Sequence, residues 1–160
     1  MIEKLSQTDI NYFMKLAIAE AKKALKNDEV PVGAVIIDKN KNIIAKGYNQ
    51  VQKKQNTMKH AEIIAIEKAL KKIKEKYLFD ASIFVTLEPC PLCATAISFA
   101  KIKNLYFGAS DEKGGAIVNE VKLYNNQKNL YKPACYHGYF ETEISNMLKD
   151  FFKNKRKNKK

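Results

Sequence analysis

The sequence contains little of what builds disulfide scaffolds or membrane proteins. Its 160 residues include no tryptophan, three cysteines, four prolines and six glycines. Three cysteines cannot all pair, and Cys90 and Cys93 are only three residues apart, so a disulfide framework is not expected. No apolar run approaches ~18 residues, which excludes a membrane span. The first six residues become polar at once, so we expect no secretion signal.

The chain is rich enough in apolar residues to form a core of its own. Hydrophobic residues make up 46% of it, and its length suits one ordinary domain. We therefore expect a single domain over residues 1–152 in a cytoplasmic protein. Residues 153–160 follow as a basic tail that continues the last helix.

Arginine is nearly absent, yet the chain is strongly basic. Of the 29 basic residues only Arg156 is not lysine, and the formal net charge is +12. An excess of this size favours polyanionic partners, above all nucleic acid. An A+T-rich genome would also encode many lysines, and basic tails are usually solvated. Charge alone therefore indicates an RNA or DNA partner only weakly.

Hydrophobic periodicity predicts alternating helices and strands. The helices are expected at residues 8–26, from 61 to about 70, at 91–100, at 118–124 and around 144–152. The strands are expected at residues 30–37, 42–47, 81–87, 103–107 and 136–140. Ser6 and Asp9 resemble a capping box before the first helix. A hairpin followed by alternating elements indicates an α/β layer fold with a mixed sheet.

Two short motifs carry the chemistry. His60 and Glu62 open one helix, and Cys90 and Cys93 lie where a strand passes into another. Cysteines three apart on a first helical turn point the same way, and the helix dipole favours the thiolates that bind metal. Three such ligands are typical of a catalytic zinc, which keeps its fourth position for water. The pattern H-x-E followed by P-C-x-x-C is typical of zinc-dependent base deaminases.

The spacing also assigns a role to Glu62 and leaves alternatives for the cysteines. A carboxylate two residues beyond a metal ligand can move protons between water and a leaving group. A C-x-x-C pair alone also occurs in redox proteins. A closed structural site would need Cys135 or His137 as a fourth ligand. We expect instead that Cys135 is a free, buried thiol and that His137 is partly buried.

Segments along nearly the whole chain carry a family resemblance. They are EVPVGAV at residues 29–35, GYN at 47–49, HAE at 60–62, TLEPC at 86–90 with Cys93, FGASD at 107–111 and FF at 151–152. Together they resemble the bacterial tRNA-specific adenosine deaminases of the cytidine deaminase superfamily. That resemblance implies a three-layer α/β/α cytidine deaminase-like fold, whose mixed five-stranded sheet is flanked by helices.

The resemblance also implies an activity and its residues. It implies that a flipped wobble adenosine of a tRNA anticodon stem-loop becomes inosine in a cytoplasmic homodimer with one zinc per subunit and no organic cofactor. The implied zinc ligands are His60, Cys90 and Cys93, with Glu62 as proton shuttle. The implied substrate contacts are the Asn49 side chain, the Ala61 backbone N–H, Val32, Asp111, Phe151 and Phe152.

The chain departs from the family pattern just before the first motif. Residues 56–59 read NTMK where the family has Asp-Pro-Thr-Ala, which could alter substrate entry. Two other functions compete with RNA deamination. One is a zinc deaminase of free bases or nucleosides, of the guanine or cytosine type, because the P-C-P-L-C segment resembles guanine deaminases about equally well. The other, ranked last, is a zinc-stabilised RNA-binding module.

Overall fold

The structure is a computed structural model that describes residues 5–119 and 121–159. Three sequence predictions touch positions outside this range. Residues 1–4 bear on the predicted absence of a secretion signal. Glu120 falls within the helix expected at 118–124, and Lys160 ends the predicted basic tail.

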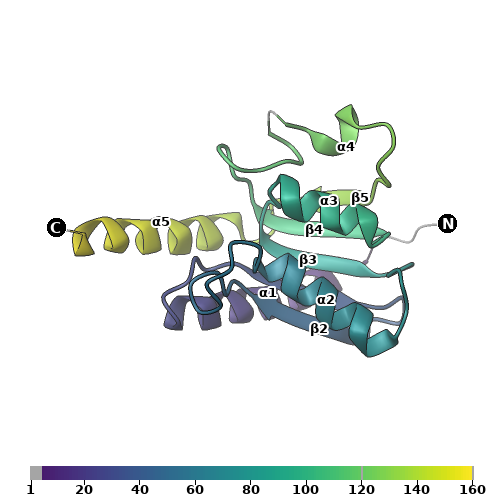
Figure 1. The fold of residues 1–160 in the computed structure, drawn as a ribbon, viewed down its shortest axis with the longest axis horizontal. Coiled ribbons are helices and arrows are strands. Elements are labelled where there is room, and N and C mark those ends of the chain that lie inside the picture. The colour runs from purple at the N-terminus through teal and green to yellow at the C-terminus, as the bar shows by residue number, and fades with distance from the viewer. Residues whose placement is uncertain (1–4, 120, 160) are drawn as a thin grey trace.

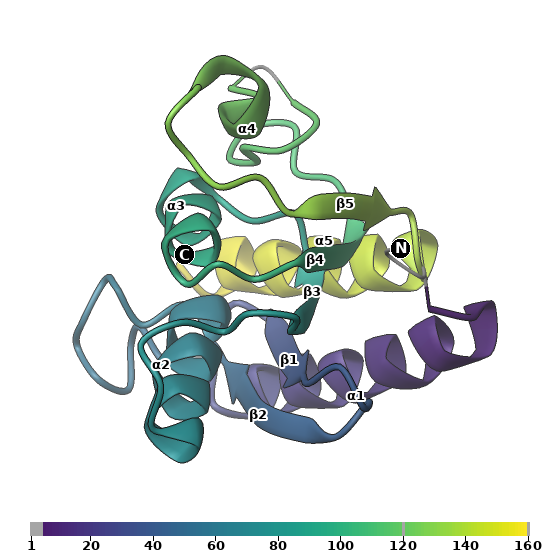
Figure 2. The same cartoon turned by 90° about the vertical axis from the view of Figure 1, so that its right-hand side faces the viewer.

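The fold is a five-stranded mixed sheet between two layers of helices (Figures 1 and 2). In chain order the elements are α1 (Gln7–Lys26), β1 (Gly33–Ile37), β2 (Ile43–Tyr48), α2 (Ala61–Ile73), β3 (Ser82–Leu87), α3 (Pro91–Phe99), β4 (Asn104–Ala109), α4 (Leu123–Asn126), β5 (Ala134–His137) and α5 (Glu141–Asn158). The strand order is β2-β1-β3-β4-β5. The predicted three-layer α/β/α fold is confirmed. No helix in the described part of the chain is long and apolar enough to cross a membrane.

The pairing of the strands gathers distant segments at one edge of the sheet. Strand β1 is antiparallel to both β2 and β3, so the start of β1 lies beside the ends of its two neighbours. Ala34 pairs with Val85 and with Gly47, and the N–H of Asn49 donates to the carbonyl of Val32 at 3.2 Å. The ends of β2 and β3 therefore lie on either side of the start of β1, and each strand leads toward a helix that begins at one of the motifs.

Two buried clusters fix the layers on either face of the sheet. One joins α2 and α3 to the sheet through side chains such as Ala65, Ile97 and Phe107. The other joins α1 and the first half of α5 to the opposite face through Phe13, Phe84 and Ile144. Because apolar burial is the main stabilising contribution, these clusters hold the helix starts in place relative to the sheet.

Two glycines let helices approach the sheet closely. A Cβ at Gly33 would lie 2.1 Å from the carbonyl oxygen of Ala17 in α1. A Cβ at Gly47 would lie 2.7 Å from the carbonyl oxygen of Ala61, the first residue of α2. Gly47 thus allows the start of α2, with the first motif, to rest directly against the end of β2.

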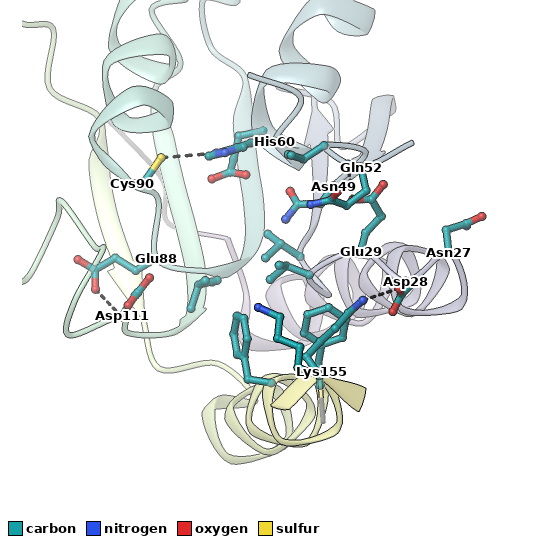
Figure 3. A pocket seen from close by; sticks show the side chains of 18 residues that line it. Asn27, Asp28, Glu29, Asn49, Gln52, His60, Glu88, Cys90, Asp111 and Lys155 are labelled. Atoms are coloured by element: carbon teal, nitrogen blue, oxygen red, sulfur yellow. Dashed lines mark hydrogen bonds and ion pairs between the residues drawn. The ribbon is translucent and has the colours of Figure 1, made fainter. Parts of the chain in front are cut away.

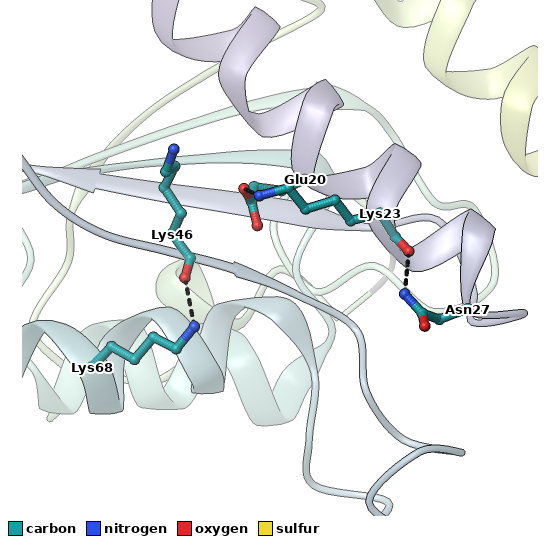
Figure 4. A network of polar contacts seen from close by, with 5 residues as sticks. All are labelled: Glu20, Lys23, Asn27, Lys46 and Lys68. Atoms are coloured by element: carbon teal, nitrogen blue, oxygen red, sulfur yellow. Dashed lines mark hydrogen bonds and ion pairs between the residues drawn. The ribbon is translucent and has the colours of Figure 1, made fainter.

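Strand β2 is an edge of the sheet, and lysine side chains lie along it. Lys68 of α2 donates to the carbonyl of Lys46 at 3.3 Å (Figure 4). On α1, the buried carboxylate of Glu20 pairs with Lys23 at 2.7 Å, and Asn27 donates to the carbonyl of Lys23 (Figure 4). Charged side chains along an edge discourage pairing with another sheet, so Lys46 and Lys68 protect β2 from such pairing.

The structure corrects the bounds of three elements, and it shifts the ends of β2 and β4 by one or two residues. Strand β5 is Ala134–His137 rather than 136–140, because Gly138 (φ +95°) and Phe140 (φ 54°) are in the left-handed region and end it. Helix α4 is Leu123–Asn126, later than the predicted 118–124. Strand β1 starts at Gly33 rather than at residue 30, since the N–H of Val32 bonds back to the carbonyl of Val30 in a turn. The first helix is capped as expected: Ser6 Oγ accepts from the N–H of Asp9 at 3.1 Å.

Candidate active site

The two motifs meet at the starts of α2 and α3. His60 is the N-cap of α2 and makes no side-chain cap, which leaves its ring free to face the cysteines. Cys90 is the N-cap of α3, Pro91 follows at the first helical position, and Cys93 is fully buried one turn on. The Nδ1 atom of His60 lies 3.6 Å from the Sγ of Cys90 and 3.4 Å from the Sγ of Cys93.

These separations match a tetrahedral zinc site. Zn–S distances of about 2.3 Å and Zn–N distances of about 2.0 Å at tetrahedral angles separate nitrogen from sulfur by about 3.5 Å. The three donor atoms also lie within 4.8 Å of one another. Two sulfurs and one imidazole are ligands that zinc accepts readily, so the residues present fit the metal.

No fourth protein ligand is present among residues 5–119 and 121–159. The candidate ligand group consists of His60, Cys90 and Cys93, and neither Cys135 nor His137 belongs to it. Cys135 is a free thiol as expected, but it is half-buried rather than buried. His137 is exposed, contrary to the prediction, and its ring stacks on Phe107 at 5.1 Å. The set of three ligands is that of an open site.

The groups around Cys90 favour its thiolate form. A hydrogen bond from the Cys93 thiol, aided by the His60 ring and opposed by burial, lowers the pKa of Cys90 to about 4. The same hydrogen bond, together with burial, raises the pKa of Cys93. A bound cation would favour the thiolate form of both.

Glu62 lies beside this cluster but is not one of its ligands. It sits in the first turn of α2 and is 4% exposed. Burial raises the pKa of Glu62 to about 7. A carboxyl group with a pKa near neutrality can both accept and donate a proton, which is the property required of a proton shuttle.

The cluster forms the floor of a pocket of about 760 Å³ (Figure 3). His60, Glu62 and Cys90 line it from the sheet side, and the last turns of α5 close the opposite side. Lys155 of α5 forms an ion pair with Asp28, just after α1, across the mouth. The pocket is large enough for a nucleotide and combines apolar walls with a few polar groups, as ligand sites usually do.

The structure brings the predicted substrate contacts to this pocket. Val32, Asn49, Asp111, Phe151 and Phe152 line it. Phe151 is buried, whereas Phe152 is 45% exposed and meets Phe151 edge to face at 5.3 Å. The Asp111 carboxylate also accepts from the backbone N–H groups of Lys113 and Gly114, so it shapes its own loop as well as the pocket wall.

The backbone N–H of Ala61, which was predicted to bind the base, donates a hydrogen bond within the protein. The backbone N–H of Ala61 donates to the Oδ1 of Asn49 at 2.8 Å. The resemblance assigned both the Ala61 N–H and the Asn49 side chain to the base. In the structure the Ala61 N–H instead holds the Asn49 side chain in place. The amide nitrogen of Asn49 is the donor left for a ligand, and the Asn49 side chain projects into the pocket (Figure 3).

Sequence reasoning missed two buried carboxylates at the pocket. Glu29 is 2% exposed and accepts from the N–H groups of Gln52 and Lys53 at 2.9 and 2.8 Å, which fixes the loop before His60. Glu88 is also 2% exposed and binds the loop after β4. Both acids stand in segments that carry the family resemblance, EVPVGAV and TLEPC, but an acid adjoining an apolar strand does not by itself indicate what it binds.

The sequence and the structure both match known deaminases. Residues 8–156 match the family described as MafB19-like deaminase. The tRNA-specific adenosine deaminase of Rickettsia bellii is 44% identical over 141 residues, which are 88% of this chain and 97% of that protein.

Two solved structures extend the comparison. One, from biochemical and structural studies of A-to-I editing by tRNA:A34 deaminases at the wobble position of transfer RNA, superposes with a TM-score of 0.83 at 40% identity. It covers 86% of this chain and 99% of its own. A guanine deaminase from Bacillus subtilis has a TM-score of 0.60 at 32% identity, covering 66% of each chain.

Proposed function

The chain belongs to the family of the tRNA-specific adenosine deaminases, and we propose that it converts adenosine to inosine at the wobble position of a tRNA anticodon. The observation that carries the proposal is the open His60–Cys90–Cys93 cluster with buried Glu62 beside it, at the floor of a nucleotide-sized pocket. The three donor side chains and the Glu62 carboxylate together are suited to the hydrolytic removal of an amino group from a ring.

The metal of the proposal is one zinc ion per subunit, held by His60, Cys90 and Cys93. Zinc at these ligands would supply a Lewis acid that makes water a nucleophile near neutral pH. Glu62 does not belong to this ligand group, which leaves its carboxylate for proton transfer rather than for coordination. No organic cofactor is required for this chemistry.

Glu62 moves the protons of the reaction. As the water oxygen adds to C6 of the purine, Glu62 takes a proton from the water and delivers it to N1. The proton of the new hydroxyl group then passes through Glu62 to the amino group, which leaves as ammonia. The carboxylate ends unprotonated, ready for another cycle, and inosine remains.

The pocket walls hold the base and its neighbours. The Asn49 amide nitrogen donates to the purine edge, and its orientation is fixed by the N–H of Ala61. Val32 packs against the base, while Asp111 and the exposed ring of Phe152 face the rest of the anticodon loop. Bases of a single-stranded loop are easily turned outward, so little energy is spent in placing adenosine at the floor.

The family resemblance also predicts a homodimer in the cytoplasm. Both stay predictions. Light scattering coupled to gel filtration measures the mass of the assembly, and a mass near twice 18.3 kDa is the expected result.

A matched substrate comparison tests the function. Zinc-loaded protein is given an anticodon stem-loop RNA with adenosine at the wobble position, or free adenosine, cytidine, cytosine or guanine. Mass spectrometry reads the products, and Glu62→Ala is the blank. Inosine formed only in the RNA is expected. Turnover of guanine alone would favour the second candidate, a free-base deaminase, which the similarity to the Bacillus subtilis guanine deaminase supports.

Deleting residues 153–160 is expected to weaken RNA binding and flatten its salt dependence. The segment contains six basic residues, and two of them, Lys155 and Lys159, line the pocket. For each phosphate that the truncated protein no longer neutralises, the slope of log K against log salt should fall by about 0.7. Fluorescence anisotropy at several salt concentrations measures the slope. Lys71→Ala, about 15 Å along α2 from the pocket, is the control, and an unchanged slope would show that the tail is only solvated.

A further inference from the structure

The carboxylate of Glu88 organises the loop that follows β4. Its Oε1 accepts from the N–H of Asp111 at 3.0 Å and from the side-chain amide of Asn119. Its Oε2 accepts from the N–H groups of Ile117 and Val118 at 2.9 and 3.0 Å. Both oxygens are thus used twice, and all four donors come from residues 111–119.

Glu88 is held by three backbone N–H groups and one side-chain amide rather than by an ion pair. The ion pairs found in residues 5–119 and 121–159 do not include Glu88, although the chain is strongly basic. A buried carboxylate is tolerated when its lone pairs all receive donors. The fit is also close, because a Cβ at Gly115 would lie 2.3 Å from the Glu88 carboxyl carbon.

The loop held by Glu88 is in turn bound to the cysteine turn. The N–H of Ala116 donates to the carbonyl of Pro89 at 2.9 Å, directly before Cys90. Further along, the Tyr124 hydroxyl donates to the carbonyl of Ala94 in the first turns of α3 at 2.7 Å. Residues 111–119 and Tyr124 therefore support the segment that contains both cysteines, and Glu88 holds residues 111–119 in place.

We propose that Glu88 is a positioning residue that couples the metal ligands to the RNA-facing loop. It fixes residues 111–119 against the Pro89–Cys90 turn, so that one carboxylate sets both the cysteines and Asp111, which lies on the pocket wall. The inference rests on the proposed function for the identity of the metal and of the RNA. The hydrogen bonds that carry it are independent of both.

Glu88→Gln is the sharpest test, because glutamine keeps the shape but not the acceptors. Either orientation of its amide turns an NH₂ group toward two donors, which leaves buried N–H groups without partners. The rate at which bound zinc passes to a chromogenic chelator is expected to rise about 10- to 100-fold, the range seen when supports of metal ligands are removed. Asn119→Ala, which removes one donor from a partly exposed position, should raise the rate less and in the same direction.

Asp38→Asn is the matched control. It also turns a carboxylate into an amide, and that carboxylate accepts from the backbone N–H groups of Asn40 and Asn42, but in the turn between β1 and β2. Its zinc release should stay within about twofold of wild type, since this turn lies at the end of β1 and β2 opposite to the pocket and Asp38 does not line the pocket. Equal acceleration in the Asp38 and Glu88 variants would overturn the proposal.

RNA kinetics and amide exchange complete the test. At saturating zinc, Glu88→Gln should raise KM for the stem-loop RNA more than it lowers kcat, and hydrogen exchange should accelerate at Asp111 and Ala116. Unchanged exchange at Ala116 would contradict the coupling, whichever metal or substrate the protein uses. A wild-type protein that binds no zinc contradicts the proposed function instead, and the exchange measurement then decides the positioning role alone.

Discussion

We expect Glu62→Ala to lower kcat for RNA deamination by about 10²–10⁴-fold, the range that proton transfer by a positioned side chain contributes. The carboxylate is 4% exposed and its pKa is raised to about 7 by burial, so no solvated group can replace it readily. Since Glu62 is outside the ligand group, the variant should keep its metal and its fold. The measurement is single-turnover formation of inosine, with metal content and thermal unfolding followed in parallel.

Glu67→Ala is the matched control for this experiment. Glu67 is on the same helix but exposed, and its carboxylate pairs with Lys59 at 3.0 Å. An exposed ion pair of this kind contributes little, so activity and stability should be close to wild type. Turnover retained in Glu62→Ala would refute the shuttle assignment. Loss of metal together with activity would show that Glu62 acts on the ligands instead.

Removal of the metal should lower activity by at least about 10³-fold while the fold persists. The loss follows because water without a Lewis acid is a poor nucleophile at neutral pH, and several kcal/mol of stabilisation disappear. The fold should persist because both faces of the sheet are packed by apolar clusters that do not depend on the ligands. Chelation followed by circular dichroism and an activity assay measures both effects, and added zinc should restore activity.

A pair of cysteine variants makes the metal experiment specific. Cys90→Ser removes one of three ligands and should abolish both zinc retention and activity. Cys135→Ser changes a free thiol outside the ligand group and should retain both. Unfolding on chelation, or loss of zinc in Cys135→Ser, would favour the closed structural site that sequence reasoning left open.

Most of the fold was predictable because periodicity records which face of an element is buried. The helix boundaries at Lys26 and at Pro91 agree with the expected ones, since caps and proline mark them locally. Two of the three corrected elements, α4 and β5, are near residues 118–140, where few apolar residues repeat. In that region residues with a left-handed backbone, such as Gly138 and Phe140, end the strand. The hydrophobic pattern of a short segment does not reveal such residues.

The group of three donor side chains was also predictable, because each residue type is one that metals accept as a ligand. His60, Cys90 and Cys93 are soft or borderline donors at helix starts, and that local context is visible in the chain. The role of the Ala61 N–H was not, because it depends on where the Asn49 side chain lies after β2 and α2 have packed. Glu29 and Glu88 were missed for the same reason: their partners are backbone groups at least 23 residues away.

The sequence by itself determined the layer architecture, the three donors and the acid beside them, since all are written in local spacing and residue type. Only the tertiary structure decided that His60 and the cysteines, 30 residues apart, face one another at 3.4–3.6 Å. It also decided that the end of α5 closes the pocket and that Glu88 holds the loop beyond β4. The physical reason is that strand register and backbone hydrogen bonds fix these distances, and neither depends on the identity of neighbouring residues alone.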